Sequence, residues 1–447
     1  MSEGRIQWIV GALALLFLFI NLAGLTWGST GEGISRFASL SQSPHFDQSQ
    51  AVQSNTLEEL QPQFGEESPG KESIDAYDDQ SMDVHADRST ESDLDSFIKS
   101  RLDKVHIPGL SAAIVKDGKI AWTGAYGFAL IGKQPVTTDT IFQLASVSKA
   151  VVAVAVMKAW EEGEFDLDED INTYLPFRVR NPHAPDIPIT ARMLLTHTST
   201  IRDRGDIMNS AYYAWNIDSS VSLDRFLKDY FTLSSDNSNP GRSFYAEDPG
   251  TAYHYSNIGA SLAAYLVEAT TGIPFDTYCE CKIFRPLGME ETSWQLADVD
   301  HSHLAMPYDY NVLCHHYSAY GFYAYPDYPD GLLKTSAPQL ARFLNMFIQY
   351  GESDGVRILK KKTVEEIRRV QNPSIDPQGG ILWYYKDLSG LRLLGHNGAD
   401  MGVTTEMFFS PADGVGVILL MNGDCTLSVE RAIKEIQIRL FKDAAYK

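Results

Sequence analysis

The chain has 447 residues, of which 44% are hydrophobic and 21% are charged, which is the balance of a globular protein that can bury a core. A formal net charge of −21 and a pI near 4.9 disfavour binding to nucleic-acid phosphates, and no basic stripe offsets this acidity. We therefore expect no nucleic-acid partner.

Residues 1–27 hold the one strongly apolar run, Ile6 to Trp27, which at roughly 20 residues is long enough to span a bilayer. Arg5 precedes the run and an acidic segment follows it, a bias that places the N-terminus inside and the remainder outside. A signal peptide cleaved between small residues such as Thr26 and Gly28 is an equal alternative. We expect the rest of the chain to be exported in both cases, either membrane-anchored with an extracytoplasmic domain or secreted.

Residues 28–91 are rich in Ser, Gln, Asp, Glu and Gly and lack a sustained apolar period. They predict a disordered acidic linker, and the folded domain is expected over 92–447. The oligomeric state is not predicted.

The four cysteines allow two interpretations. Export would permit a disulfide between Cys314 and either Cys279 or Cys281, whereas free buried thiols are at least as consistent with the spacing. A zinc site that combines these cysteines with His315 and His316 is disfavoured, because the spacing does not match a two-plus-two finger. We expect neither a metal nor another cofactor.

The predicted elements of the first half begin with a helix from Ser92, where apolar residues recur at helical spacing. Strands over 109–115 and 120–128 flank Asp117-Gly118, a strong hairpin signal. The Ala- and Val-rich run from Leu144 to Trp160 predicts a buried helix.

Residues 160–300 predict mostly helix and loop, and strands return near the C-terminus. These strands are expected over 391–394, 404–409 and 415–421, with a turn at Asp413-Gly414 and a final helix over 428–441. Strands at both ends of the domain indicate one antiparallel sheet built from both termini.

The first chemical motif is Ser146-Val147-Ser148-Lys149. Two other Ser-x-x-Lys matches occur, at Ser68 and Ser96, but only Ser146 opens an apolar helix. Helical residues three apart share a face, so the Lys149 amine can reach the Ser146 hydroxyl, and we expect burial to depress the pKa of Lys149. Such a lysine can activate a serine nucleophile. The alternative is a helix cap beside a surface lysine.

Two further motifs lie downstream. In Tyr255-Ser256-Asn257, a tyrosine beside ammonium or imidazolium groups could act as a base, and Asn257 could bind the lysine or a substrate carbonyl. The alternative is an aromatic anchor in a loop.

In His396-Asn397-Gly398, placed between two predicted strands, the glycine lets a substrate backbone approach. The next amide, that of Ala399, can donate to an oxyanion. A structural histidine is the alternative interpretation of His396.

In this order the three motifs resemble the active-site signature of the serine β-lactamase and penicillin-binding-protein superfamily. The Tyr-x-Asn and His-x-Gly forms are similar to those of the class C β-lactamase, D-Ala-D-Ala carboxypeptidase and esterase branch. Three more stretches match that branch: Leu194-Leu195-Thr196-His197-Thr198-Ser199, the segment from Pro249 to Asn257, and the segment from Phe284 to Met289. The resemblance covers about residues 91 to 440.

The resemblance implies an α/β (α+β) fold of the β-lactamase/transpeptidase type, a three-layer α/β/α sandwich with a central antiparallel sheet and an all-helical subdomain. It also implies that deacylation falls to Tyr255, because no Glu-x-x-Leu-Asn loop is visible. Three positions depart from the branch's pattern. Thr200 and Ala399 replace common glycines, and His396 stands where true β-lactamases commonly have lysine, which disfavours efficient β-lactam hydrolysis.

The sequence thus predicts a serine hydrolase that acts on a small ester, amide or peptide through an acyl-enzyme on Ser146. Lys149 and Tyr255 would activate the serine, the amides of Ser146 and Ala399 would hold the oxyanion, and Asn257 and His396 would orient the substrate. A catalytically inactive binding or scaffold protein at a membrane is the alternative. Loops 201–245 and 300–330, the second rich in tyrosine, are expected to wall the pocket; these tyrosines could equally be core residues.

Overall fold

The computed structural model describes residues 92–208, 212–232 and 240–446. The predicted anchor or signal peptide (1–27) and the predicted linker (28–91) lie outside the described residues. Among the helices of the described part, none combines the length and the apolar character needed to cross a bilayer.

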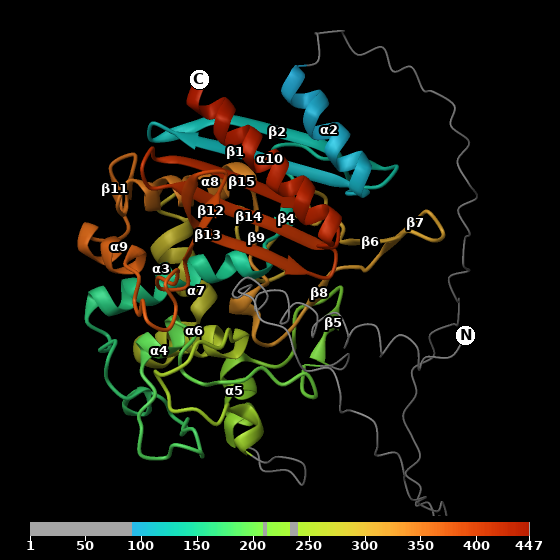
Figure 1. Cartoon of the computed structure of the whole chain (residues 1–447). Coiled ribbons are helices and arrows are strands. Elements are labelled where there is room, and N and C mark those ends of the chain that lie inside the picture. Colours follow the sequence, from blue (N-terminus) through green and yellow to red (C-terminus); the bar gives the residue numbers. More distant parts are fainter. Residues whose placement is uncertain (1–91, 209–211, 233–239, 447) are drawn as a thin grey trace, which may run out of the picture. The chain divides into compact units, whose positions relative to one another are not determined.

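The centre of the domain is a seven-stranded sheet in the order β12-β13-β14-β15-β1-β2-β3, and its neighbouring strands run antiparallel (Figure 1). β1 lies beside β15, with Leu110 opposite Met421. The sheet is therefore built from both ends of the domain, as the sequence predicted. Its strands are β1 (Gly109–Lys116), β2 (Lys119–Leu130), β3 (Gln134–Pro135), β12 (Tyr384–Leu388), β13 (Leu391–Asp400), β14 (Val403–Ser410) and β15 (Val415–Met421).

The predicted turns are confirmed. Asp117 and Gly118 have φ of 52° and 72°, the paired positive values that a two-residue hairpin between twisted strands requires, and Lys116 pairs with Lys119 across it. Gly414, with φ of 67°, closes the connection from β14 to β15.

Helices cover both faces of the sheet, which gives three layers. On one face α2 (Asp93–Val105) lies beside the C-terminal helix α10 (Leu427–Tyr446) (Figure 1), and their apolar residues share one core cluster with β1 and β15. A capping box between Ser92 and Asp95 begins α2, close to the predicted start. On the other face α8 (Ala337–Ile348) packs on β1, β2 and β15.

The helical subdomain surrounds α3 (Ser148–Glu162), whose residues 148–157 are all buried, so the predicted buried helix is confirmed. α3 packs against α6 (Asn257–Thr271), and both share a core with α8. The remaining helices are α4 (Ala191–Leu195), α5 (Leu223–Thr232), α7 (Phe275–Cys279) and α9 (Lys361–Arg368), with short turns η2 (Ala145–Val147), η3 (Ile171–Thr173), η5 (Pro240–Ser243), η6 (Glu280–Phe284) and η7 (Tyr328–Asp330).

Short two-stranded sheets brace the connections between the larger elements. They pair β4 (Ile141–Gln143) with β9 (Lys334–Ser336), β5 (Ala214–Trp215) with β8 (Tyr323–Ala324), β6 (Tyr308–Asn311) with β7 (His316–Ala319), and β10 (Glu352–Ser353) with β11 (Val356–Arg357). The β4–β9 pair matters most for function, because β4 leads directly into the turn that carries Ser146.

Two sequence interpretations change. The His396-Asn397-Gly398 motif lies inside β13 and not between strands, because β13 stays paired with β14 as far as Asp400. All four cysteines are free thiols, so the disulfide interpretation is wrong; Cys281 and Cys314 are exposed. Among the described residues, no group of three His, Cys, Asp or Glu side chains could hold a metal ion.

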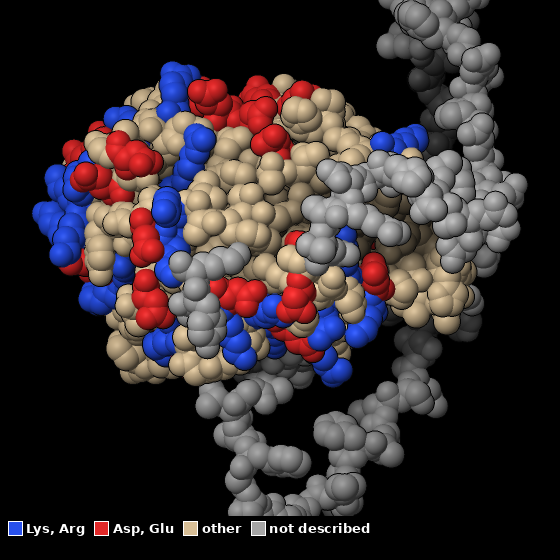
Figure 2. All heavy atoms as spheres, turned by 90° about the horizontal axis from the view of Figure 1, so that it is seen from above, with Lys and Arg blue, Asp and Glu red and all other residues tan. Residues whose placement is uncertain are grey.

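Acidic and basic side chains are interspersed on the face of the domain that Figure 2 shows, and the basic residues form no continuous stripe there.

Candidate active site

Ser146 lies in a sharp turn between the sheet region and α3. After β4 the chain passes through Ala145, whose φ of 47° is left-handed. Ser146 lies in the middle of η2, a 3₁₀ helix of three residues. α3 itself begins two residues later, at Ser148. The predicted proximity still holds, because Lys149 Nζ donates a 3.0 Å hydrogen bond to Ser146 Oγ.

Lys149 is fully buried, and its amine also donates to the backbone carbonyl oxygen of Asp330 at 2.7 Å. Burial acts to lower its pKa, but the charges of Tyr255, Asp330 and Asp203 outweigh burial, so the net pKa is raised. The prediction of a depressed lysine pKa is therefore wrong: burial was visible in the sequence, whereas the acidic partners were not. Lys149 holds its proton at neutral pH.

Tyr255 approaches the same oxygen from the start of α6. Its hydroxyl donates a 3.0 Å hydrogen bond to Ser146 Oγ, and its ring lies 5.2 Å from Lys149 Nζ. The ring also packs on His197 with centroids 4.4 Å apart, while 40% of Tyr255 remains exposed. Lysine and tyrosine thus converge on one serine oxygen.

Asp203 organises the Tyr255-Ser256-Asn257 segment and was not predicted. Its carboxylate accepts hydrogen bonds from Ser256 Oγ at 2.9 Å, from the Asn257 amide at 2.9 Å and from the Ile258 amide at 3.1 Å. Two of these donors, those of Asn257 and Ile258, are free backbone amides at the N-terminus of α6, which a carboxylate satisfies well. No motif spacing links Asp203 to this helix, so the sequence carried no signal for it.

His197 has a structural part in the site. Its Nδ1 accepts a hydrogen bond from the Ser256 amide at 3.2 Å, and burial keeps its pKa well below the usual value, so the ring is neutral. Thr200, in place of the common glycine, adopts a φ of 63°. Its hydroxyl bonds the Ser199 carbonyl at 2.6 Å and the Asn181 amide at 2.9 Å, which ties down this strained turn.

His396 is buried on β13, and its Nδ1 lies 2.5 Å from the Asn397 carbonyl oxygen. Burial, followed by the Lys149 charge, lowers the pKa of His396 to about 3. The His396 imidazole is therefore neutral, and Lys149 is the positive neighbour of Tyr255.

Gly398 lets β13 approach the serine turn. A Cβ built on it would lie 2.9 Å from the Ser146 amide nitrogen, 2.5 Å from the Leu144 carbonyl oxygen and 2.4 Å from Thr405 Oγ1. Thr405 Oγ1 itself donates to Leu144 O at 2.6 Å, which fastens the turn to the sheet. Only glycine fits this contact.

A partly open cavity of about 110 Å³ lies beside Ser146. Ser146, Asn257 and Ala399 line it together, as predicted for nucleophile and substrate-binding residues. Most of its other wall residues come from the two predicted loops and from the turn that holds Ser146, whereas Gly331 follows the second loop and Asp400 ends β13. The other wall residues are Ala145, Met208, Tyr212, Tyr213, Tyr325, Asp327, Asp330, Gly331 and Asp400. Of the tyrosines predicted in 300–330, Tyr325 is the one in this wall, whereas Tyr308 and Tyr323 are core residues.

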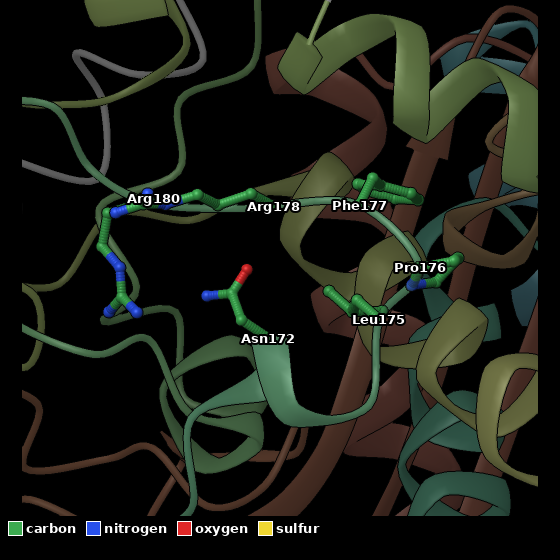
Figure 3. A pocket seen from close by; sticks show the side chains of 6 residues that line it. All are labelled: Asn172, Leu175, Pro176, Phe177, Arg178 and Arg180. Atoms are coloured by element: carbon green, nitrogen blue, oxygen red, sulfur yellow. The ribbon is translucent and has the colours of Figure 1, made fainter.

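A second hollow, of about 430 Å³, lies in the helical subdomain and contains none of the motif residues (Figure 3). Asn172 lies in its wall, donates to Asp170 Oδ1 and to Val179 O, and accepts from the Val179 amide. Arg180 pairs with Asp170 beside it. These side chains are engaged in holding the loop after η3.

The chain combines an antiparallel sheet and a helical subdomain with a serine that is hydrogen-bonded to a lysine and a tyrosine. This combination is typical of serine hydrolases of the β-lactamase type. A family model described as Beta-lactamase matches residues 94–438, and the chain belongs to the β-lactamase family. The suspected superfamily and the predicted fold are thereby confirmed.

The chain is also similar in sequence to known proteins. The chain is 27% identical over 342 residues to the unguisins hydrolase ungD' of Aspergillus campestris, covering 74% of this chain and 61% of that protein. It thus spans about three fifths of the length of the curated relatives it matches.

Two solved structures share the fold. One is the octameric penicillin-binding protein homologue from Pyrococcus abyssi, with a TM-score of 0.61 and 25% identity over 78% of this chain and 77% of that chain. The other is the D-amino acid amidase from Ochrobactrum anthropi SV3, with a TM-score of 0.62 and 22% identity over 79% of this chain and 99% of that chain.

Proposed function

We propose that this chain is a serine hydrolase that cleaves an ester or amide bond through an acyl-enzyme on Ser146. One observation carries the proposal: Ser146 Oγ accepts hydrogen bonds of 3.0 Å from both Lys149 and Tyr255 at the wall of a cavity. A serine hydroxyl needs a neighbouring base to become a nucleophile, and Tyr255, held beside the Lys149 ammonium, is the group in contact with Ser146 that would supply it. Membership in the β-lactamase family and the likeness to a relative named a hydrolase support the proposal.

In the first step Ser146 Oγ attacks the substrate carbonyl carbon and gives up its proton. The raised pKa of Lys149 keeps the amine protonated, so the base would be Tyr255 in its phenolate form, stabilised by the neighbouring Lys149 ammonium. The phenolate oxygen would take the serine proton across the 3.0 Å contact between Tyr255 Oη and Ser146 Oγ as Oγ attacks. The amides of Ser146 and Ala399 would hold the oxyanion, which Gly398 makes possible by bringing β13 against the serine turn.

In the second step Tyr255 returns the proton to the leaving group and then activates the water that releases the acyl group. Asn257 lines the cavity and would orient the substrate carbonyl. His396, neutral and buried on β13, would hold the strand in place and would not act as a charged group.

Pre-steady-state hydrolysis of a p-nitrophenyl ester tests this proposal. An acyl-enzyme predicts a burst of p-nitrophenol whose amplitude follows the enzyme concentration, and Ser146→Ala should abolish it. Ser96→Ala is the matched control, because Ser96 belongs to another Ser-x-x-Lys sequence, lies at an exposed position of α2 and should leave the burst intact. A burst that persists in folded Ser146→Ala protein would exclude Ser146 as the nucleophile.

A further inference from the structure

Aromatic rings connect the wall of the cavity beside Ser146 with the surface of the domain. Tyr325 and Tyr213 both line the cavity, and their ring centroids lie 5.8 Å apart. Tyr213 in turn lies 6.0 Å from Trp215, which is outside the cavity wall and 43% exposed. We call Tyr325, Tyr213 and Trp215 the aromatic row. Its inner end faces the cavity of the nucleophile, and its outer end is accessible to solvent.

The outer end of the aromatic row is held by paired strands. Trp215 on β5 is the register partner of Tyr323 on β8 (Figure 1). The pairing extends past Trp215, because the Asn216 amide donates to the Phe322 carbonyl oxygen at 2.7 Å and the Phe322 amide donates to Asn216 Oδ1 at 3.1 Å. Trp215 is therefore exposed on a fixed backbone, and its ring can contact a ligand with little loss of conformational entropy.

The tyrosine hydroxyls of this region are bonded to the end of β13 and to the residue after it. Tyr325 OH donates to Asp400 Oδ2 at 3.2 Å, and Tyr323 OH donates to the Met401 carbonyl oxygen at 3.0 Å. Because these hydroxyls already have partners, the rings offer mainly carbon atoms to a ligand. A tryptophan held at the surface beside such rings is the kind of side chain that commonly anchors an apolar group.

The cavity is too small to enclose more than a short part of a substrate. Its volume of about 110 Å³ lies below the roughly 300–1,000 Å³ of pockets that enclose a small molecule. A substrate whose carbonyl carbon reaches Ser146 must therefore extend past the wall unless it is very short. The aromatic row offers this extension an apolar surface, and Ile217 and Val221, further along the same segment, are 61% and 38% exposed. An apolar chain that lies on this surface is removed from water, which is favourable.

We propose that the aromatic row binds an extended apolar acyl chain whose carbonyl carbon is attacked by Ser146. This inference rests on the proposed acyl-enzyme and adds the substrate class, an ester or amide of a medium-length, unbranched carboxylic acid. Tyr325 is bonded to Asp400, the neighbour of Ala399, whose amide would hold the carbonyl oxygen, so the row begins beside the acyl carbonyl. Trp215 would determine specificity, because an acyl group that ends within the cavity does not reach it and a longer chain does.

A comparison of two acyl lengths tests the proposal. The full chain is assayed with p-nitrophenyl butyrate and p-nitrophenyl octanoate, which share one leaving group, and each kcat/KM is divided by the rate of spontaneous hydrolysis. Each methylene that leaves water increases binding about fourfold, and this gain appears in kcat/KM. The corrected kcat/KM for the octanoate ester should therefore exceed that for the butyrate ester at least about tenfold, even if only some of the four extra methylenes are buried. An octanoate ester that reacts no faster than the butyrate ester would overturn the proposal.

Variants locate the effect at the outer end of the row. Trp215→Ala should reduce the ratio of the octanoate value to the butyrate value at least about fivefold, the loss expected when an aromatic anchor is truncated. Phe128→Ala is the matched control, because Phe128 is 44% exposed, lies on β2 outside the cavity wall and should leave the ratio unchanged. If Trp215→Ala does not fold, Trp215→Gln takes its place. An unchanged ratio in a folded variant would contradict the assignment of Trp215.

The two proposals fail in different ways. If both esters give equal corrected values and a burst that depends on Ser146, the assignment of the acyl chain is wrong and the acyl-enzyme stands. If neither ester reacts while a fluorophosphonate still labels Ser146, the acyl chain is again wrong and the nucleophile stands. If the fluorophosphonate also fails to label folded protein, the proposed function itself is wrong.

Discussion

Tyr255→Phe is the most informative substitution, because it removes one oxygen and leaves the ring in place. The phenylalanine ring can keep the packing on His197, at 4.4 Å, and the contact with Lys149, at 5.2 Å. What disappears is the hydroxyl that lies 3.0 Å from Ser146 Oγ with no intervening group. Direct proton transfer by such a group is worth ~10²–10⁴ in rate, so kcat/KM should fall by this factor, which corresponds to about 3–5 kcal/mol of transition-state free energy.

The assay is the second-order rate of serine acylation by an activated ester, with the melting temperature measured in parallel. Stability should change little, since Tyr255 is 40% exposed and loses one hydrogen bond worth about 1 kcal/mol. Tyr253→Phe is the matched control: Tyr253 is 42% exposed, two residues away, and packs edge-on against the same histidine. A Tyr255→Phe enzyme that acylates at the wild-type rate would refute Tyr255 as the proton acceptor.

Two further predictions concern β13. Gly398→Ala places a Cβ 2.9 Å from the Ser146 amide nitrogen. We expect denaturant titration to show a loss of about 1–3 kcal/mol in unfolding free energy, and we expect the rate of ester hydrolysis to fall as well because the serine turn is displaced. Gly205→Ala is the neutral control, because a Cβ there meets nothing within 4 Å. The pKa of His396 is about 3 in the folded chain and near 6.5 in the unfolded chain. Between pH 6.5 and pH 3 the unfolded chain therefore binds more protons, and the free energy of unfolding falls as the pH is lowered across this range. His396→Gln should therefore shrink the loss of unfolding free energy between pH 7 and pH 4 by roughly 1–3 kcal/mol, and an unchanged pH dependence would contradict a neutral buried imidazole.

Local features of the fold were predictable because they depend on neighbours in sequence. Asp117-Gly118 required a tight hairpin, and the spacing of Ser146 and Lys149 required proximity at the start of a helix. The meeting of Ser146 with Tyr255, 109 residues apart, depended on the family resemblance and not on any local pattern.

The features of the site that the sequence did not predict depend on interactions between segments that are distant in sequence. Asp203 caps α6 across a separation of 53–55 residues, and Asp330, from a distant loop, accepts a hydrogen bond from Lys149 through its backbone carbonyl. The pKa of Lys149 is raised by Tyr255, Asp330 and Asp203, all distant in sequence, so a prediction from burial alone had the wrong sign. The extent of β13 through His396 likewise depends on its pairing with β14.

The intact mass of the full chain after exposure to a fluorophosphonate tests the central claim most directly. The account predicts one adduct per chain on the wild type, located on Ser146, and no adduct on Ser146→Ala. Folded wild-type protein that takes up no adduct, or an adduct that survives in Ser146→Ala, would contradict an activated serine at this site.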